Sequence, residues 1–283
     1  MWLESNQETR KELSLDKIAT VADRVSHAPG VCGITITGGE PLLRSDINDI
    51  VRICKKTDLK VALATNGIFL TKQLASSLVS GGIEHFDIGF TQPDSRVKLA
   101  VAAAAGTGCS VTASVCVHNS NYRETGTLVK KAAAMGADAV ALNRFAPTGR
   151  GRINQDDLCL KTRDILTALK LADKAAAEAG IFVYTGIPVE PCTAQREMFP
   201  AITFSTCQCG EAKWTIDPAG NLKTCEQNPE TLGNLLRSPF TEIVENSKNS
   251  IDSFRRWGNS EGCFSCSLPG NCSGGCRFSE QSH

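Results

Sequence analysis

The 283-residue sequence has no long hydrophobic run and no net charge. No apolar stretch reaches the roughly 20 residues that a membrane-spanning helix needs, and the polar start, Met1 to Glu8, does not suit a secretory signal. Thirty basic residues balance 30 acidic ones, so neither a nucleic acid nor a membrane surface is expected as a partner. These absences predict a cytoplasmic protein with one large domain and a small one.

Histidine is also scarce, with four residues, whereas there are 13 cysteines. Cytoplasmic thiols are kept reduced, and an odd number suits a disulfide framework poorly. Four of the cysteines follow the spacing C-x2-C-x5-C-x3-C, at Cys263, Cys266, Cys272 and Cys276. Glycines between them allow the tight turns that aim several sulfurs at one point. The spacing predicts a metal or iron–sulfur site, with a structural zinc knot or a disulfide cluster as the plainer alternatives.

Most of the chain alternates between strand and helix patterns. Strands are predicted at residues 31–37, 60–65, 85–90, 109–118, 138–143 and 181–184. Helices are predicted at residues 14–25, 46–54, 71–81, 96–105, 127–135 and 162–179. This alternation is typical of a parallel α/β sheet or barrel, in which the chemistry lies at the carboxyl ends of the strands.

Three loops at those strand ends have unusual compositions. Residues 38–41 read Gly-Gly-Glu-Pro, and two glycines there leave backbone groups open to a ligand. Glu40 offers a carboxylate or its backbone carbonyl to a cation, and residues 66–67 read Asn-Gly. The third loop carries Arg144, Arg150 and Arg152; these arginines are suited to an anionic group, but a solvated loop is the preferred interpretation.

Three cysteines and two histidines of the first part are interpreted as structural residues. Cys32, Cys54 and Cys109 lie on apolar faces and are predicted to be core residues. His85 and His118 are interpreted as ordinary strand residues.

The pattern changes after residue 187. Prolines and no periodicity at residues 188–200 indicate a linker. Pro218 and Gly220 then suit a hairpin turn, and pairing of Asp217 with Asn221 would bring Cys225 nearly opposite Lys213, close to Cys209. Two thiol ligands are therefore expected on one hairpin.

Two motifs together resemble a known family. Thr37-Gly-Gly-Glu-Pro-Leu-Leu-Arg44 and Thr65-Asn66-Gly67 are similar to the S-adenosylmethionine (SAM) motifs of radical SAM enzymes. Cys209, Gly220, Cys225 and the four-cysteine run resemble the SPASM extension, which carries auxiliary [4Fe–4S] clusters, as does Leu232-Gly-Asn-Leu235. The resemblance implies an incomplete (β/α)6 barrel, a partial TIM barrel, at residues 1–187, followed by a small cysteine-rich α+β domain at residues 188–283.

The resemblance also implies site residues. SAM would be held by Gly38, Gly39, Glu40, Pro41, Thr65 and Asn66. One auxiliary cluster would use Cys209, Cys225 and Cys276, completed by Cys207 or by the more distant Cys192. The second would use Cys263, Cys266 and Cys272. No catalytic residue is assigned.

The sequence departs from the family pattern in two places. The C-x3-C-x2-C loop that binds the catalytic cluster does not occur in the 283 residues, and the family's first strand is missing with it. We expect both to be encoded upstream of Met1, as a contiguous block lost by truncation. The family's seventh SPASM cysteine is expected beyond His283.

The resemblance implies cleavage of SAM to a 5′-deoxyadenosyl radical and hydrogen abstraction from a peptide or protein. Thioether or carbon–carbon crosslinking of a precursor peptide is the first expectation, before sulfatase-type oxidation and cofactor-precursor processing. An electron donor such as a flavodoxin or ferredoxin is the expected partner. A non-catalytic iron–sulfur scaffold and a structural zinc-binding module are the alternatives.

Overall fold

The computed structural model describes residues 12–256 and 274–278. The helices are α1 (Leu15–Ser26), α2 (Ile47–Lys55), α3 (Lys72–Gly81), α4 (Ser95–Ala105), α5 (Thr125–Ala134), α6 (Gln155–Leu158), α7 (Thr162–Ala179), α8 (Phe240–Asn246) and α9 (Lys248–Arg255). The strands are β1 (Gly33–Ile36), β2 (Lys60–Thr65), β3 (Ile83–Gly89), β4 (Ser110–Val117), β5 (Ala139–Arg144), β6 (Phe182–Thr185), β7 (Ile202–Phe204), β8 (Thr215–Ile216), β9 (Asn221–Lys223) and β10 (Gly233–Asn234).

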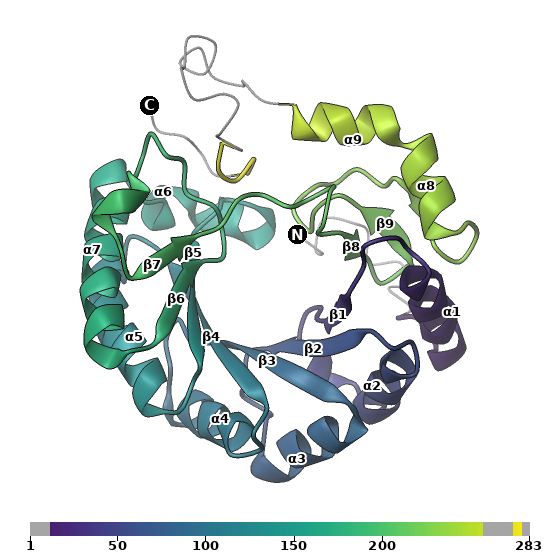
Figure 1. Ribbon diagram of the computed structural model, residues 1–283, viewed down its shortest axis with the longest axis horizontal. Coiled ribbons are helices and arrows are strands. Elements are labelled where there is room, and N and C mark those ends of the chain that lie inside the picture. Colours follow the sequence, from purple (N-terminus) through teal and green to yellow (C-terminus); the bar gives the residue numbers. More distant parts are fainter. Residues whose placement is uncertain (1–11, 257–273, 279–283) are drawn as a thin grey trace.

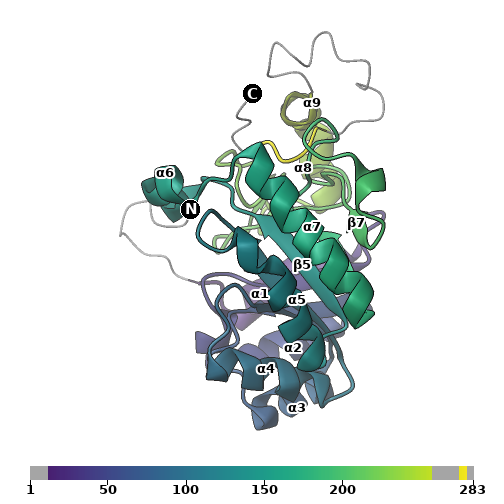
Figure 2. The ribbon, with the colours of Figure 1, turned by 90° about the vertical axis from the view of Figure 1, so that its left-hand side faces the viewer.

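Strands β1 to β7 form one parallel sheet in sequence order. The sheet curves into an open barrel with α2, α3, α4, α5 and α7 on its outer side (Figure 1). Helices α5 and α7 pack side by side along that outer side (Figure 2). The fold is the partial α/β barrel that the strand–helix alternation predicts, and a small domain follows it.

The core lies between the outer face of the sheet and these helices. Alternate strand residues point outward and are fully buried, among them Leu63, Phe86, Ile88 and Val115. The residues between them point to the inner face, where small and polar side chains such as Asp87, Ser114 and Asn143 remain partly exposed. Because side chains alternate along a strand, one sequence supplies both an apolar outer face and a polar inner face.

The seventh strand differs from the prediction. Residues 188–200 read as a linker, but the chain then forms β7, which pairs in parallel with β6 from Val183–Ile202 to Thr185–Phe204. Three residues are too few to show a periodic pattern, so no sequence signal marks this strand. The parallel sheet therefore extends beyond residue 187.

The small domain contains the predicted hairpin. Strands β8 and β9 pair in antiparallel fashion, with Thr215 opposite Lys223, and the Asp217 amide donates to the Asn221 carbonyl at 3.0 Å. Strand β10 adds to β9. The turn has Gly220 at φ +84°, as its position in the sequence requires.

The small domain packs against α1 rather than standing apart. Leu222, Leu235 and Phe240 bury their side chains with Val21 and Val25 of α1. The Arg24 guanidinium donates to the Leu235 carbonyl at 2.6 Å and to the Ser238 carbonyl at 3.2 Å. Helix α1 therefore joins the small domain to the barrel.

Two further observations concern single residues and helices. Cys54 is buried as predicted, but the prediction for Cys32 is wrong: it is exposed, because it precedes β1 at the edge of the sheet. Cys109 is partly buried.

No helix within the described residues has both the length and the apolar character needed to cross a membrane.

Candidate functional site

The loop after β1 is held by the Glu40 carboxylate. Its Oε1 accepts hydrogen bonds from the Leu42 amide at 3.0 Å and from the Thr65 hydroxyl at 2.6 Å. Its Oε2 accepts from the Asn66 amide at 2.8 Å. The structure thus brings residues 38–41 and 65–66 together, and the carboxylate that was considered as a cation ligand instead joins the ends of β1 and β2.

The two glycines of this loop border open space. A Cβ atom built on Gly38 or on Gly39 has no neighbour within 4 Å, and Gly38 has φ +151°. A bare backbone beside open space admits the close approach of a ligand to its N–H and C=O groups. The loop therefore fits the predicted cofactor-binding role through its backbone, while Pro41 is buried beneath it.

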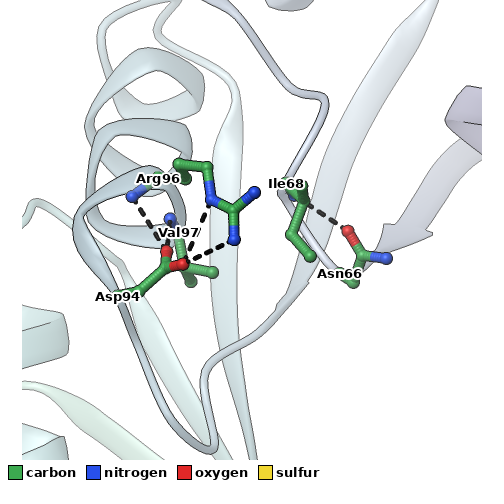
Figure 3. Close-up of polar contacts among 5 residues, drawn as sticks. All are labelled: Asn66, Ile68, Asp94, Arg96 and Val97. Carbon is green, nitrogen blue, oxygen red and sulfur yellow. Dashed lines mark hydrogen bonds and ion pairs between the residues drawn. The ribbon is translucent and has the colours of Figure 1, made fainter.

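The Asn66–Gly67 turn closes the end of β2. The Asn66 Oδ1 accepts from the Ile68 amide at 2.8 Å, so its side chain folds back on its own loop (Figure 3). Gly67 has φ +78°, and a Cβ atom there would lie 3.0 Å from Ile88. Close to this turn, Asp94 caps α4 by accepting from the Arg96 and Val97 amides (Figure 3). The turn is thus rigidly placed, and its outer atoms remain exposed.

We expect Glu40→Gln to destabilise the protein by about 1–3 kcal/mol, because the new NH2 group must face at least one backbone N–H that now donates to a carboxylate. Urea unfolding measures the loss. Glu245→Gln on α8 is the matched control, since Glu245 is exposed. Equal unfolding midpoints for the two variants would contradict the role given to Glu40.

Three of the predicted cysteine ligands converge beneath the hairpin. The sulfurs of Cys209 and Cys225 lie with a Glu226 carboxylate oxygen within 4.8 Å of one another. Cys207 is hydrogen-bonded through its sulfur to Cys209. Cys192, the other candidate, is exposed. Glu226 was not predicted as a neighbour of this site, although it directly follows Cys225 in the sequence.

The three thiols interact through side-chain hydrogen bonds, with Cys209 bonded to both of the others. The hydrogen bond from Cys209 lowers the pKa of Cys207 to about 6. The same thiol lowers the pKa of Cys225, while its own pKa is raised by its bonds to the other two sulfurs. Thiolates are the ligand form of cysteine, so this donor set suits an iron–sulfur cluster or zinc.

Cys276 approaches the same centre from the C-terminal segment. Burial raises the pKa of its thiol, and its charge interacts with those of Cys225 and Cys207. Cys276 is thus within electrostatic range of two of the three cysteines of residues 207–225. Their assignment as ligands remains a prediction, and Cys263, Cys266 and Cys272 lie outside the described residues.

A buried ion pair lies under the Cys276 segment. The Arg144 guanidinium, at the end of β5, donates to both carboxylate oxygens of Glu190, one bond measuring 2.8 Å. Their side chains are 8% and 3% exposed. A Cβ atom on Gly275, which has φ +72°, would lie 2.2 Å from the Glu190 carboxylate. The predicted solvated loop is therefore wrong for Arg144; Arg152 is exposed, and the Arg150 side chain is outside the described part.

Sequence reasoning missed Asp87, a carboxylate on the inner face of β3. It pairs in register with Thr112 of β4 and receives a hydrogen bond from Ser114. Burial raises the pKa of its carboxyl group. The signal available in the sequence was a lone acid between Phe86 and Ile88, both apolar, in a predicted strand.

Comparisons with known proteins identify two domain families along the chain. The radical SAM superfamily model matches residues 3–140, and an iron–sulfur cluster-binding domain model, SPASM, matches residues 207–267. A PqqA peptide cyclase from Streptomyces rochei is 27% identical over 266 residues, which cover 88% of this chain and 71% of the relative. The mycofactocin maturase MftC of Mycolicibacterium smegmatis is 24% identical over 293 residues, covering 96% and 72%.

A solved structure has the same fold. Streptococcus suis SuiB, bound to its precursor peptide SuiA, matches with a TM-score of 0.77 at 18% identity, covering 96% of this chain and 67% of that one. At this identity the likeness concerns the fold. The two domain models occur in the order in which the structure places the SAM-type loop and the cysteine centre, and the chain therefore belongs to the radical SAM superfamily and carries a SPASM domain.

Proposed function

We propose that this protein modifies a peptide by radical SAM chemistry on the inner face of its barrel. One observation carries the proposal: both candidate cofactor sites adjoin the same face of the sheet. A Cβ atom on Gly89 of β3 would lie 3.6 Å from the Asn66 Cα, and the Asn66 amide donates to Glu40 of the SAM-type loop, residues 38–41. Asp87, one step along the same face, interacts electrostatically with Lys213, which is four residues from Cys209. A substrate on this face would lie between the two sites.

The residues present suit SAM and one auxiliary cluster. The open backbone of Gly38 and Gly39 admits a ligand, and the Glu40 bonds hold that backbone in place. Cys207, Cys209, Cys225 and Cys276 would hold the auxiliary [4Fe–4S] cluster. Bound together, SAM and a reduced catalytic cluster supply a hydrogen-abstracting radical. The barrel wall would orient the substrate and exclude water from that reaction.

The catalytic cluster itself has no ligand set in the printed sequence. The 283 residues contain no C-x3-C-x2-C triplet. The proposed activity therefore requires these three thiolates to be supplied to the chain.

A peptide is the proposed substrate class because one relative is named a PqqA peptide cyclase and SuiB, which has the same fold, is bound to a precursor peptide. Formation of a thioether or carbon–carbon crosslink in a precursor peptide is the preferred reaction. Reducing equivalents would come from a flavodoxin or ferredoxin in the cytoplasm, where thiols stay reduced.

Metal content tests this proposal against a zinc-binding module. We expect protein purified without oxygen to be brown and to lose iron and sulfide in air, because oxygen oxidises iron–sulfur clusters held by thiolates. Iron, sulfide and zinc analyses with the visible spectrum measure this. A colourless protein with stoichiometric zinc would overturn the proposal in favour of a structural zinc site. A chain that is supplied with the cysteine triplet and binds iron, but does not bind SAM, would instead indicate a non-catalytic iron–sulfur scaffold.

A further inference from the structure

Asp87 is a carboxylate with few partners on the inner face of the barrel. It is a partly exposed residue of β3, between Ala64 of β2 and Thr112 of β4 in the sheet register. Ser114 provides its side-chain hydrogen bond. Among the described residues, no lysine, arginine or histidine forms an ion pair with it, whereas Glu84 on the same strand pairs with Lys55 at 2.7 Å.

The nearby charged and polar groups are already engaged. Lys213 Nζ forms an ion pair with Glu226 at 3.1 Å. His85 Nδ1 is hydrogen-bonded to the Ser110 hydroxyl at 2.7 Å, and Tyr184 to Thr112. A partly buried acid that forms no ion pair is costly in its ionised form, and burial accordingly raises the pKa of the Asp87 carboxyl. Packing does not require an acid here, since the neighbouring inner-face residues are Ala64, Thr112 and Ser114.

Asp87 lies between the two candidate cofactor sites on the inner face. Gly89, the next inner-face residue of β3 after Asp87, adjoins the turn at Asn66. On the other side, Lys213 connects Asp87 electrostatically to the hairpin that carries Cys209 and Cys225. A group bound at Asp87 would therefore lie within the region where the proposed reaction occurs.

We propose that Asp87 is a specificity-determining residue that binds a cationic group of the peptide substrate, a lysine or arginine side chain or a free amino group. This inference rests on the proposed function and adds a charge requirement to it. A cation would complete the hydrogen bonding of the carboxylate and balance its charge, and such a pair discriminates strongly against neutral groups of the same shape.

Selection from a library of short random peptides tests the inference. The full chain is reconstituted with iron and sulfide, supplied with SAM without oxygen, and immobilised. We expect the recovered peptides to be enriched in lysine or arginine at one position. A recovered peptide and its norleucine analogue, which lacks the ammonium group, are then compared by fluorescence anisotropy. The analogue should bind at least about tenfold more weakly.

Two variants locate the effect at Asp87. Asp87→Asn keeps the shape of the side chain and removes its charge, so it should bind the lysine peptide and the norleucine analogue equally. Glu84→Gln, on the same strand and exposed, should keep the full difference. Thermal unfolding checks the fold, and Asp87→Asn should be no less stable than the parent at neutral pH, because burial disfavours the ionised acid.

The outcomes separate this inference from the proposed function. Peptides recovered without basic residues, or a lysine preference that Asp87→Asn retains, would overturn the role of Asp87 and leave peptide binding intact. Recovery of no peptide above background would contradict peptide binding itself, and the inference with it.

Discussion

Replacing Cys225 by alanine is expected to remove one complete iron–sulfur cluster, about four iron atoms per chain, from the reconstituted protein. Cys225 contributes one of three sulfurs that the structure gathers at one centre. A cubane cluster loses a corner ligand in the variant, and the buried surroundings offer the carboxylate of Glu226 as the nearest substitute. A carboxylate oxygen is a poorer ligand than a thiolate for these clusters.

Cys266→Ala is expected to remove only the other cluster. Its predicted ligands Cys263, Cys266 and Cys272 number three, so one corner of that cluster would be open and the cluster would be lost first under a chelator. Cys32→Ala is the matched control, because Cys32 is an exposed cysteine outside both sets and should leave the iron content unchanged. Iron analysis and EPR of the three variants measure the result. Equal losses from Cys225→Ala and Cys266→Ala would mean that the ligands are partitioned wrongly.

The 283-residue chain is expected to form no 5′-deoxyadenosine when incubated with SAM and dithionite. Reductive cleavage needs an electron delivered directly to the sulfonium of SAM, and the C-x3-C-x2-C triplet that would hold the delivering cluster is not in this sequence. Binding of SAM should also be weak, since only backbone groups of residues 38–41 and the Asn66 turn are available to it.

A gain of function provides the control for this result. The same chain, joined to a preceding segment that contains a C-x3-C-x2-C triplet on a strand-end loop, should form 5′-deoxyadenosine after reconstitution. A triplet with its cysteines changed to alanine should not. Chromatography of the nucleoside products measures both. Formation of 5′-deoxyadenosine by the unmodified 283 residues would refute the prediction.

The barrel could be predicted from the sequence because each of its units repeats one physical pattern. A buried run, a glycine or asparagine turn and an amphipathic helix specify a strand–helix unit locally, as at β2, Gly67 and α3. Strand β7 was not predicted because its three residues carry no periodic pattern, and its position depends on long-range pairing with β6. Cys32 was misplaced because an edge position is a property of the whole sheet.

The sequence predicted which residues of the candidate sites lie together, but not always what each side chain contacts. The hairpin register followed from Pro218 and Gly220, so the approach of Cys225 to Cys209 could be expected. The carboxylate of Glu40 was considered for a cation, yet it bonds Thr65 and Asn66, which lie on a different strand end. Arg144 pairs with Glu190, which is 46 residues away in the sequence, and no local sequence pattern predicts such a pair.

The packing of the Cys276 segment on the Arg144–Glu190 pair has a consequence for the order in which the protein folds during synthesis. Residues 207–225 leave the ribosome well before Cys276, whose segment must then return to the barrel and place Gly275 against Glu190. Closing that loop late has an entropic cost that a bound cluster would repay. With Cys276 as a ligand, as predicted, cluster insertion would follow synthesis of the chain through Cys276, and a protein without the cluster would have a folded barrel before residues 274–278 had docked.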